Sequence, residues 1–182
     1  MQTSGRALID PLEIFQKVGL SSGMRVADMG CGRTGHFVFP AARVVGEKGV
    51  VYAVDILKDV LHSLGSWIKS EGLDNVQTIW SDIEKINKTP IPAKSVDACF
   101  FMNVISHLKD KSGALSEAAR LVKDDGQVVV IDWSKNLGTL GPQAGESADP
   151  KKIIELAENS GLRLVENFSC SDYHYCLLFK KA

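Results

Sequence analysis

The segment Val26–Phe37, VADMGCGRTGHF, constrains the fold most, because an apolar run leads through Asp28 directly into three closely spaced glycines. Gly30, Gly32 and Gly35 have the spacing of a turn that joins a strand to a helix and brings bare backbone close to a ligand. The segment therefore predicts a strand, a ligand-binding turn and a helix. The carboxylate of Asp28 is expected to lie close to whatever the glycines hold.

Apolar runs alternate with amphipathic stretches along the rest of the chain. The run at 50–54 is almost wholly apolar, which is typical of parallel strands that are buried on both faces. Helix starts are indicated at Asp10-Pro11 and Asp149-Pro150, where an N-cap acid precedes a proline. The alternation predicts strands at 24–29, 50–54, 76–80, 96–102 and 127–131, and helices at 11–19, 35–45, 57–70, 113–122 and 150–161.

The last two apolar segments, 162–168 and 174–180, are separated by too few residues for a parallel crossover. They are therefore predicted to run antiparallel and to form a hairpin. Five βα units followed by a hairpin predict a doubly wound α/β sandwich, with a ligand crevice at the carboxyl ends of strands one and four. A chain of 182 residues with 45% hydrophobic content is expected to form one domain, with residues 1–22 as an N-terminal helix and linker.

Composition narrows the class of ligand. The formal net charge of −1 gives no electrostatic attraction for nucleic acid, and no apolar run is long enough to cross a bilayer. The charged first 20 residues do not resemble a targeting signal, and four cysteines without a CxxC pair are expected to stay reduced. These features predict a cytoplasmic protein that acts on a small molecule, without nucleic-acid or membrane partners.

The choice of cofactor depends on two acids. Asp55 ends the second strand twenty residues after Gly35, where a carboxylate can accept hydrogen bonds from both hydroxyls of a ribose. NAD and S-adenosylmethionine both fit this pattern, but the Asp28 carboxylate would oppose the pyrophosphate of NAD. It would stabilise the ammonium and sulfonium of S-adenosylmethionine directly or through water, and therefore favours that cofactor.

The chain resembles a class I S-adenosylmethionine-dependent methyltransferase, of the broad group that includes ubiquinone and menaquinone biosynthesis methylases. The resemblance rests on VADMGCGRTGHF, VYAVDI, IWSDIE, VDACFFMNVISHL and the closing hairpin, and covers nearly the whole chain. It implies a seven-stranded, mostly parallel Rossmann-like sheet in the order 3-2-1-4-5-7-6, with strand seven antiparallel and helices on both faces.

The resemblance also implies a role for each residue of the cofactor site. Gly30 and Gly32 line the methionine part, and Asp55 holds the ribose. Asp82 accepts a hydrogen bond from the adenine amino group, and Asn103 faces the transferring methyl. Ile56 and Ile83 stack against the adenine ring, so that the expected cofactor-binding set is Asp28, Gly30, Cys31, Gly32, Gly35, Asp55, Ile56, Asp82, Ile83 and Asn103.

Several positions keep a plainer interpretation beside the functional one. Asp55 and Asp82 are also good turn formers or helix caps, and Cys31 is also a good packing residue. The family usually reads DxGxGxG, whereas Arg33-Thr34 lengthens the gap between two glycines here, as if one residue were inserted. Arg33 is therefore expected to point either to solvent or toward a substrate.

The candidate catalytic residues are His36, His107 and Asn103. A histidine beside the substrate could act as a general base, although His107 could instead pack against or cap the following helix. Because the sulfonium already activates the methyl group, positioning of the acceptor can supply much of the rate. Glycines in the loop 133–149 predict a lid over the cofactor, with a plain surface connection as the alternative.

The closing hairpin contains a second group of interest, Cys170, His174 and Cys176. A structural zinc site usually needs four ligands at tighter spacing, so no metal is expected. The rings of Tyr173, His174 and Tyr175 are expected either to end the hairpin or to reach the mouth of the active site.

Three functions fit the sequence. The first is an enzyme that transfers a methyl group from S-adenosylmethionine to an acceptor, most simply a small molecule. The second is an NAD-dependent oxidoreductase, for which the glycine turn and Asp55 also qualify. The third is a non-catalytic, methyltransferase-like module that binds the cofactor.

Overall fold

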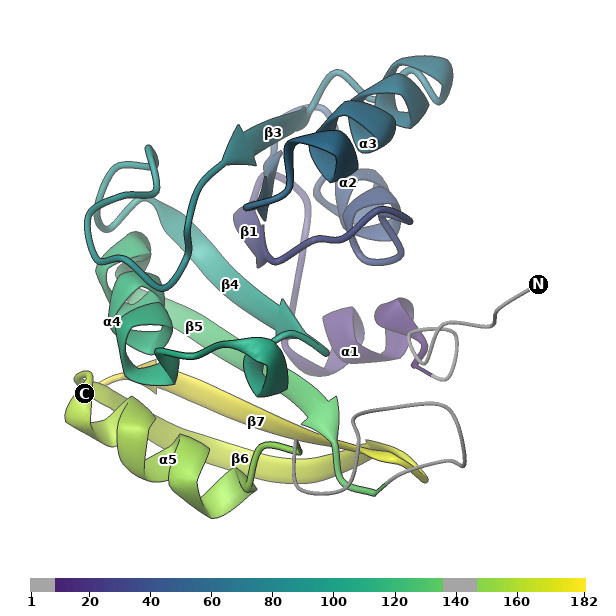
Figure 1. The fold of residues 1–182 in the computed structure, drawn as a ribbon. Helices are drawn as coiled ribbons and strands as arrows, with labels where there is room; N and C mark the ends of the chain where they lie inside the picture. Colours follow the sequence, from purple (N-terminus) through teal and green to yellow (C-terminus); the bar gives the residue numbers. More distant parts are fainter. Residues whose placement is uncertain (1–8, 136–146) are drawn as a thin grey trace.

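The computed structural model describes residues 9–135 and 147–182, and its strands and helices alternate as the sequence predicts (Figure 1). The strands are β1 (Arg25–Met29), β2 (Val50–Asp55), β3 (Val76–Trp80), β4 (Val96–Met102), β5 (Val122–Trp133), β6 (Leu162–Ser171) and β7 (His174–Lys181). The helices are α1 (Pro11–Lys17), α2 (Val38–Val45), α3 (Lys58–Ser70), α4 (Lys111–Leu121) and α5 (Pro150–Asn159), with a short 3-10 helix η2 (Ile105–His107).

The strands form one seven-stranded sheet in the order β3-β2-β1-β4-β5-β7-β6. The pairs from β3 through β5 are parallel, and β7 runs antiparallel to both of its neighbours, β5 and β6. This confirms the predicted strand order and the predicted hairpin. The order reverses between β1 and β4, so a crevice is expected where these two strands end.

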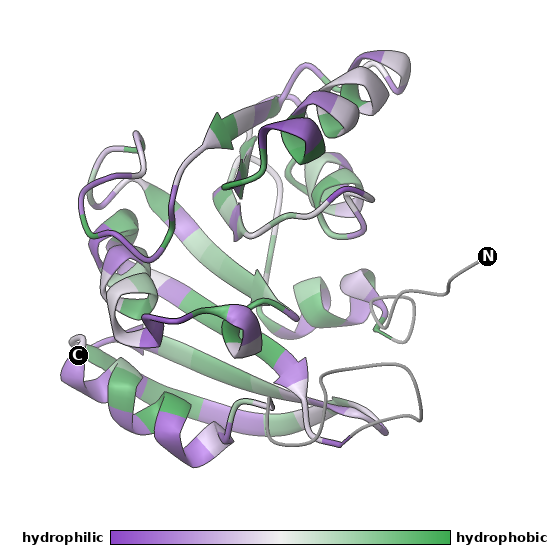
Figure 2. Cartoon of the chain, in the orientation of Figure 1, coloured by the Kyte–Doolittle hydropathy of each residue, from purple (hydrophilic) through white to green (hydrophobic). Residues whose placement is uncertain are grey.

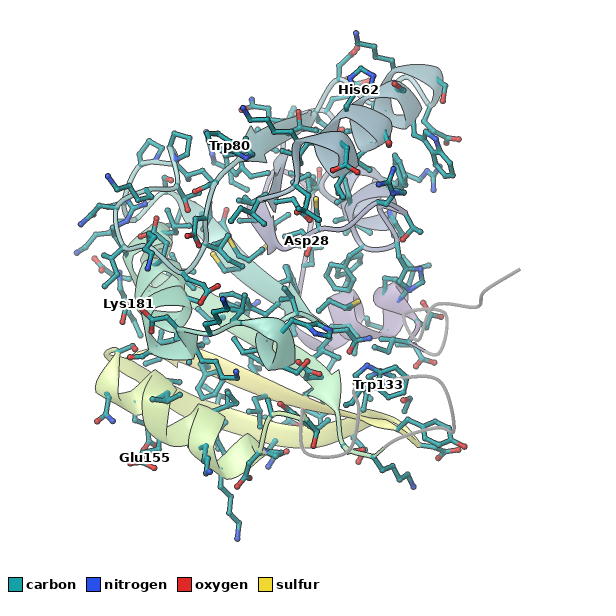
Figure 3. The ribbon with its side chains drawn as sticks, viewed as in Figure 1. Asp28, His62, Trp80, Trp133, Glu155 and Lys181 are labelled. Carbon is teal, nitrogen blue, oxygen red and sulfur yellow. The ribbon has the colours of Figure 1, made fainter. Side chains whose placement is uncertain are left out.

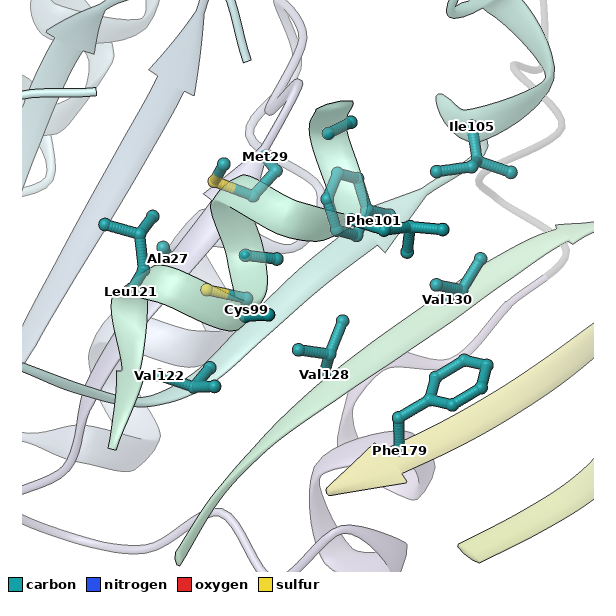
Figure 4. Close-up of a cluster of buried hydrophobic side chains, with 14 of the residues drawn as sticks. Ala27, Met29, Cys99, Phe101, Ile105, Leu121, Val122, Val128, Val130 and Phe179 are labelled. Carbon is teal, nitrogen blue, oxygen red and sulfur yellow. The ribbon is translucent and has the colours of Figure 1, made fainter. Parts of the chain in front are cut away.

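The core lies on both faces of the sheet, because successive strand residues point to opposite sides. In β4, Cys99 and Phe101 pack with residues of α4 and α5, whereas Phe100 and Met102 pack with residues of α1, α2 and α3. Figure 4 shows the first of these clusters. Figure 2 shows the central strands as mostly hydrophobic ribbons with polar residues on the outer faces of the helices. Burial on both faces explains the continuous apolar runs in the sequence.

Three acids cap helices. Asp10 and Asp149 accept hydrogen bonds from the backbone N–H of Leu12 and Lys151 at 2.8 and 3.0 Å, which confirms both predicted helix starts. Asp110 caps α4 and accepts from the N–H of Gly113 at 2.8 Å. The helix therefore begins at Lys111, before the predicted start at 113, because the cap lies outside the apolar pattern.

Other element boundaries also differ from those predicted. β5 begins at Val122 rather than at 127, because Val122 already pairs with Val96 of β4. The charged residues 123–125, which lie between the predicted helix and the predicted strand, belong to this strand. β6 continues to Ser171 rather than to 168, and α2 begins at Val38 rather than at 35. No helix of the described residues is long and apolar enough to span a membrane.

Candidate active site

A pocket with a volume of about 330 Å³ opens at the carboxyl ends of β1, β2, β3 and β4. It brings together residues that are far apart in the sequence and that come from four strand ends and from η2. Most of the predicted cofactor residues line it, and so does the catalytic candidate His107. The lining residues are Gly30, Gly32, Asp55, Ile56, Asp82, Ile83, Glu84, Asn103, Val104, His107 and Leu108.

A larger hollow of about 620 Å³ lies at the opposite edge of the sheet, near the amino ends of β2 and β3. There Asn75 donates hydrogen bonds to the carbonyl oxygens of Ala42 and Gly46 at 2.8 and 2.9 Å, which ties the start of β3 to the end of α2. None of the predicted site residues lines this hollow. The pocket at the carboxyl edge is therefore the candidate active site.

The glycine turn forms one wall of the pocket through backbone that only glycine adopts easily. Gly30, Gly32 and Gly35 have φ angles of 82°, 66° and 57°, all in the left-handed region. A Cβ atom added to Gly30 would come within 2.5 Å of Val104 Cγ2, from the loop after β4. The turn and that loop therefore approach each other more closely than any side chain at position 30 would allow.

Asp55 joins the glycine turn to the end of β2. Its Oδ2 accepts from the N–H of Gly32 at 3.0 Å, and its Oδ1 accepts from the N–H of Leu57 at 2.9 Å. The carboxylate is thus a turn former, as the plainer interpretation predicted, and it also lines the pocket. Each carboxylate oxygen can accept a second hydrogen bond, so these contacts leave capacity for hydroxyl groups of a ligand.

The loop after β3 carries Asp82, Ile83 and Glu84 into the pocket and is held against α4. Asp82 Oδ1 accepts from the N–H of Glu84 at 3.0 Å, and the Glu84 carboxylate accepts from the N–H of Asp110, the cap of α4. A Cβ atom added to Gly113 would overlap the carbonyl oxygen of Glu84. The first turn of α4 therefore fixes the position of this loop at the pocket.

The sequence profile of a family described as "Methyltransferase domain" matches residues 20–167. The chain belongs to this family. The resemblance to S-adenosylmethionine-dependent methyltransferases that the glycine motif indicates is thereby confirmed.

Known proteins agree with this assignment. A crystal structure of a SAM-dependent methyltransferase from Aquifex aeolicus superposes with a TM-score of 0.85 at 28% identity, covering 94% of this chain and 89% of that chain. Aklanonic acid methyltransferase DauC of Streptomyces sp. is 34% identical over 74% of this chain and 57% of its own length. The ubiquinone/menaquinone biosynthesis C-methyltransferase UbiE of Vibrio cholerae is 30% identical over 64% of this chain and 44% of its own length. The chain thus spans about half the length of the curated relatives it matches.

In this methyltransferase domain, Asn103 follows β4 with a left-handed φ of 49°, and its N–H donates to the carbonyl of Ile131 at 2.8 Å. Its Nδ2 lies 3.3 Å from Nε2 of His174, the first residue of β7. Its Oδ1 is buried and has no hydrogen-bond partner among the residues that the structure describes. Sequence reasoning did not find this pair, because no spacing pattern joins residues 71 positions apart.

Asp132, at the end of β5, is a second residue that sequence reasoning missed. Its side chain is fully buried and accepts from the N–H and hydroxyl of Ser106 at 2.9 and 3.2 Å and from the N–H of Trp133 at 2.8 Å. Burial raises the pKa of Asp132, and the hydrogen bonds from Ser106 and Trp133 oppose that shift. The acid thereby anchors η2, which carries His107. Its position at a strand's carboxyl end, like that of Asp55, is the signal that could have revealed it.

Some predicted residues do not line the pocket. Asp28 is buried within β1, on the same face as Val26 and near the centre of Figure 3, and Cys31 and Gly35 are buried beside the turn. Nε2 of His36 lies 3.0 Å from the carbonyl oxygen of Ile9. Cofactor binding by Asp28, Cys31 and Gly35, and catalysis by His36, stay predictions.

The longer glycine turn directs Arg33 to the protein surface. The guanidinium pairs with Asp59 of α3 at 2.5 Å and donates to the hydroxyl of Ser63 at 3.0 Å, and Arg33 is not among the lining residues of the pocket. The side chain is 58% exposed. Of the two predicted directions, solvent is the one observed.

Cysteine and histidine residues outside the pocket lie in the core, in the closing hairpin or on the surface. Cys99 is fully buried in the core, and burial raises its pKa well above the ordinary range of a thiol. Burial also raises the pKa of Cys170 to about 11. No group of three metal-ligating side chains occurs within residues 9–135 and 147–182. His62 lies on the exposed side of α3, as Figure 3 shows. Most of the predicted lid, residues 136–146, lies outside the described residues.

Proposed function

We propose that this chain binds S-adenosylmethionine in the pocket at the ends of β1–β4 and transfers its methyl group to a small-molecule acceptor. The observation that carries the proposal is the order of the lining residues across the sheet. Asp82 follows β3, Asp55 ends β2, the glycines follow β1 and Asn103 follows β4. Since these strands are neighbours in that order, the residues at their carboxyl ends follow one another along the edge of the sheet.

An extended cofactor follows this path from one end to the other. Asp82 binds the adenine amino group, and Asp55 binds the ribose hydroxyls with the acceptor capacity that its backbone contacts leave. Ile83, which is 6% exposed, and Ile56, which is 54% exposed, provide apolar contacts for the adenine ring. Gly30 leaves room for the methionine part.

The donor end of the cofactor then lies at Asn103, where the sheet order reverses. Asp28, two residues before Gly30, stabilises the positive sulfonium and ammonium directly or through water. The methyl group needs no further activation, so the chain's task at this end is to hold the acceptor in line with the departing thioether.

His107 is the general-base candidate that best fits the pocket. It lines the pocket from η2 and is exposed, so an acceptor that must lose a proton can reach its ring. A small-molecule acceptor is supported by relatives that are an aklanonic acid methyltransferase and a C-methyltransferase of ubiquinone/menaquinone biosynthesis.

Titration calorimetry with S-adenosylmethionine, S-adenosylhomocysteine and NADH tests the cofactor. We expect binding of the first two and none of NADH. A folded chain that binds only NADH would instead support the oxidoreductase alternative. Incubation with a labelled methyl donor and a panel of phenols, quinols and amines then tests turnover. Binding without transfer to any acceptor would favour the non-catalytic module.

A further inference from the structure

We infer that His174 is a positioning residue that fixes the side chain of Asn103 at the donor end of the pocket. The inference rests on the proposed function, which places the donor end of the cofactor beside Asn103. His174 itself is not among the lining residues and acts through Asn103.

Hydrogen bonds link the pocket to the turn of the β6–β7 hairpin. Asn103 Nδ2 donates to His174 Nε2 at 3.3 Å, and His174 Nδ1 lies 2.9 Å from the hydroxyl of Ser171. An amide NH₂ group can only donate, so Nε2 must be unprotonated and the ring proton must reside on Nδ1. Ser171 Oγ then accepts from Nδ1–H and also from the N–H of Tyr173 at 3.2 Å. One tautomer of His174 satisfies all three contacts.

The imidazole has little freedom to leave this position. His174 is fully buried, and its ring centroid lies 4.2 Å from that of Trp133, with the planes inclined at 41°. In the sheet it pairs with Trp133 on one side and with Ser171 on the other. Neighbouring β-sheet backbone and an aromatic ring therefore hold the acceptor nitrogen in place.

A neutral ring suits a site for a cationic cofactor. Burial lowers the pKa of His174 to about 4, so the ring is uncharged near pH 7. Among the described residues, the thiol of Cys170 is an ionisable neighbour, since its sulfur lies 3.8 Å from the His174 carbonyl oxygen. Asp132 precedes Trp133 and pairs with Tyr175, so its carboxylate points to the opposite face of the sheet from the His174 ring. A protonated ring would place a second positive charge beside the sulfonium and would turn Nε2 into a donor facing the amide NH₂ of Asn103.

Asn103 is held with hydrogen-bonding capacity unused. Its Oδ1 is buried and unpartnered within the described part of the chain, and the amide keeps a second N–H besides the one given to His174. Unsatisfied buried polar atoms cost stability and are uncommon outside sites of function. Without His174 the amide could turn to satisfy these groups within the protein, and the pocket would lose a fixed polar group.

Two substitutions of His174 separate hydrogen bonding from packing. His174→Phe keeps a ring against Trp133 but removes the acceptor, and we expect it to weaken S-adenosylhomocysteine binding roughly three- to tenfold. His174→Gln offers a carbonyl oxygen near the position of Nε2, and we expect affinity within about twofold of wild type. Tyr175→Phe is the matched control, because it removes a buried β7 hydrogen bond, to the Ala148 carbonyl, that is not connected to Asn103.

Nitrogen NMR of histidine-labelled protein gives a readout that packing alone would not move. We expect the Nε2 resonance of His174 to have the shift of an unprotonated acceptor nitrogen, and to move in Asn103→Ala. A protonated Nε2 in the wild type, or equal affinity of wild type and His174→Phe, would overturn the inference. If His174→Phe does not fold, the affinity of His174→Gln and the Nε2 resonance of the wild type still test the inference. Wild type that binds no S-adenosylhomocysteine would instead overturn the proposed function, whatever the tautomer.

Discussion

Gly30 and Val104 approach so closely that a Cβ atom on Gly30 would lie 2.5 Å from Val104 Cγ2. The two residues follow β1 and β4, the neighbouring strands between which the winding of the sheet reverses. Both line the pocket, so the contact between them forms part of its wall at the proposed donor end. The missing side chain at position 30 is thus a feature of the pocket itself.

Gly30→Ala is expected to reduce affinity for S-adenosylhomocysteine at least about tenfold, because the new methyl group displaces Val104 and the left-handed φ is strained for alanine. Calorimetry measures the affinity, and thermal unfolding measures the strain. Gly161→Ala is a matched control, since Gly161 has a φ of 80° but nothing within 4 Å of its Cβ position. If both variants lost affinity equally, the contact with Val104 would not be the cause.

Asp55→Asn is expected to lower cofactor affinity by about tenfold or more, because one carboxylate oxygen becomes an NH₂ group that cannot accept from Gly32, Leu57 or a ribose hydroxyl. The measurement is calorimetric titration with S-adenosylhomocysteine. Asp59→Asn is the control, because this exposed acid pairs with Arg33 away from the pocket. Unchanged affinity in Asp55→Asn would remove the ribose role proposed for Asp55.

Gly113→Ala is expected to weaken cofactor binding from outside the pocket. The new Cβ would press on the carbonyl oxygen of Glu84 and shift the loop that carries Asp82 and Ile83. Comparison with Gly65→Ala isolates this effect, since Gly65 lies in α3 with open space at its Cβ position. Gly65→Ala should leave cofactor affinity unchanged. It should leave the free energy of unfolding unchanged or raise it by up to about 1 kcal/mol, because alanine is more favourable than glycine in a helix interior. Unchanged cofactor affinity in Gly113→Ala would mean that α4 does not determine the position of the loop after β3.

His174 predicts a pH dependence of stability with a defined sign. Burial lowers its pKa to about 4 in the folded chain, so the unfolded chain binds more protons between its ordinary pKa, near 6.5, and pH 4. The stabilisation is complete above about pH 6.5 and is lost as the pH falls toward 4, and each tenfold difference in proton affinity between the folded and unfolded chains corresponds to about 1.4 kcal/mol. Asp132, whose pKa burial raises, contributes with the opposite sign.

Chemical denaturation of wild type and His174→Phe across pH 4 to 7 isolates the histidine, because Asp132 is common to both proteins. The difference in unfolding free energy should decline below pH 6.5 and be level above it. A difference that stays constant through this range would show that His174 titrates equally in the folded and unfolded chains.

The features that repeat along the sequence could be predicted from it. Glycines at 30, 32 and 35 mark the turn, and Asp55 and Asp82 mark strand ends, because these signals are local and depend on backbone conformation and on the period of two. The antiparallel hairpin followed from the short connection before His174. The strand order followed from the family resemblance.

Contacts between distant segments could not be predicted in the same way. The Asn103–His174 pair and the anchoring of Ser106 by Asp132 depend on how β4, β5 and β7 align, which no local pattern specifies. The early start of β5 was hidden by charged residues that face solvent near Val122. The ion pair of Arg33 with Asp59 of α3 likewise depends on how distant segments pack together.

The hairpin's contact with Asn103 has a consequence for the order in which the protein is made. The last lining residue of the pocket in the sequence is Leu108, so all of them are synthesised before β7. The residue that orients Asn103, however, belongs to β7. A contact that spans 71 residues forms late, because the intervening chain must first be ordered. A nascent chain that has emerged only through β5 would therefore have the walls of the pocket without its last fixed polar group. Full affinity for the cofactor would therefore be reached only once the final strand is in place.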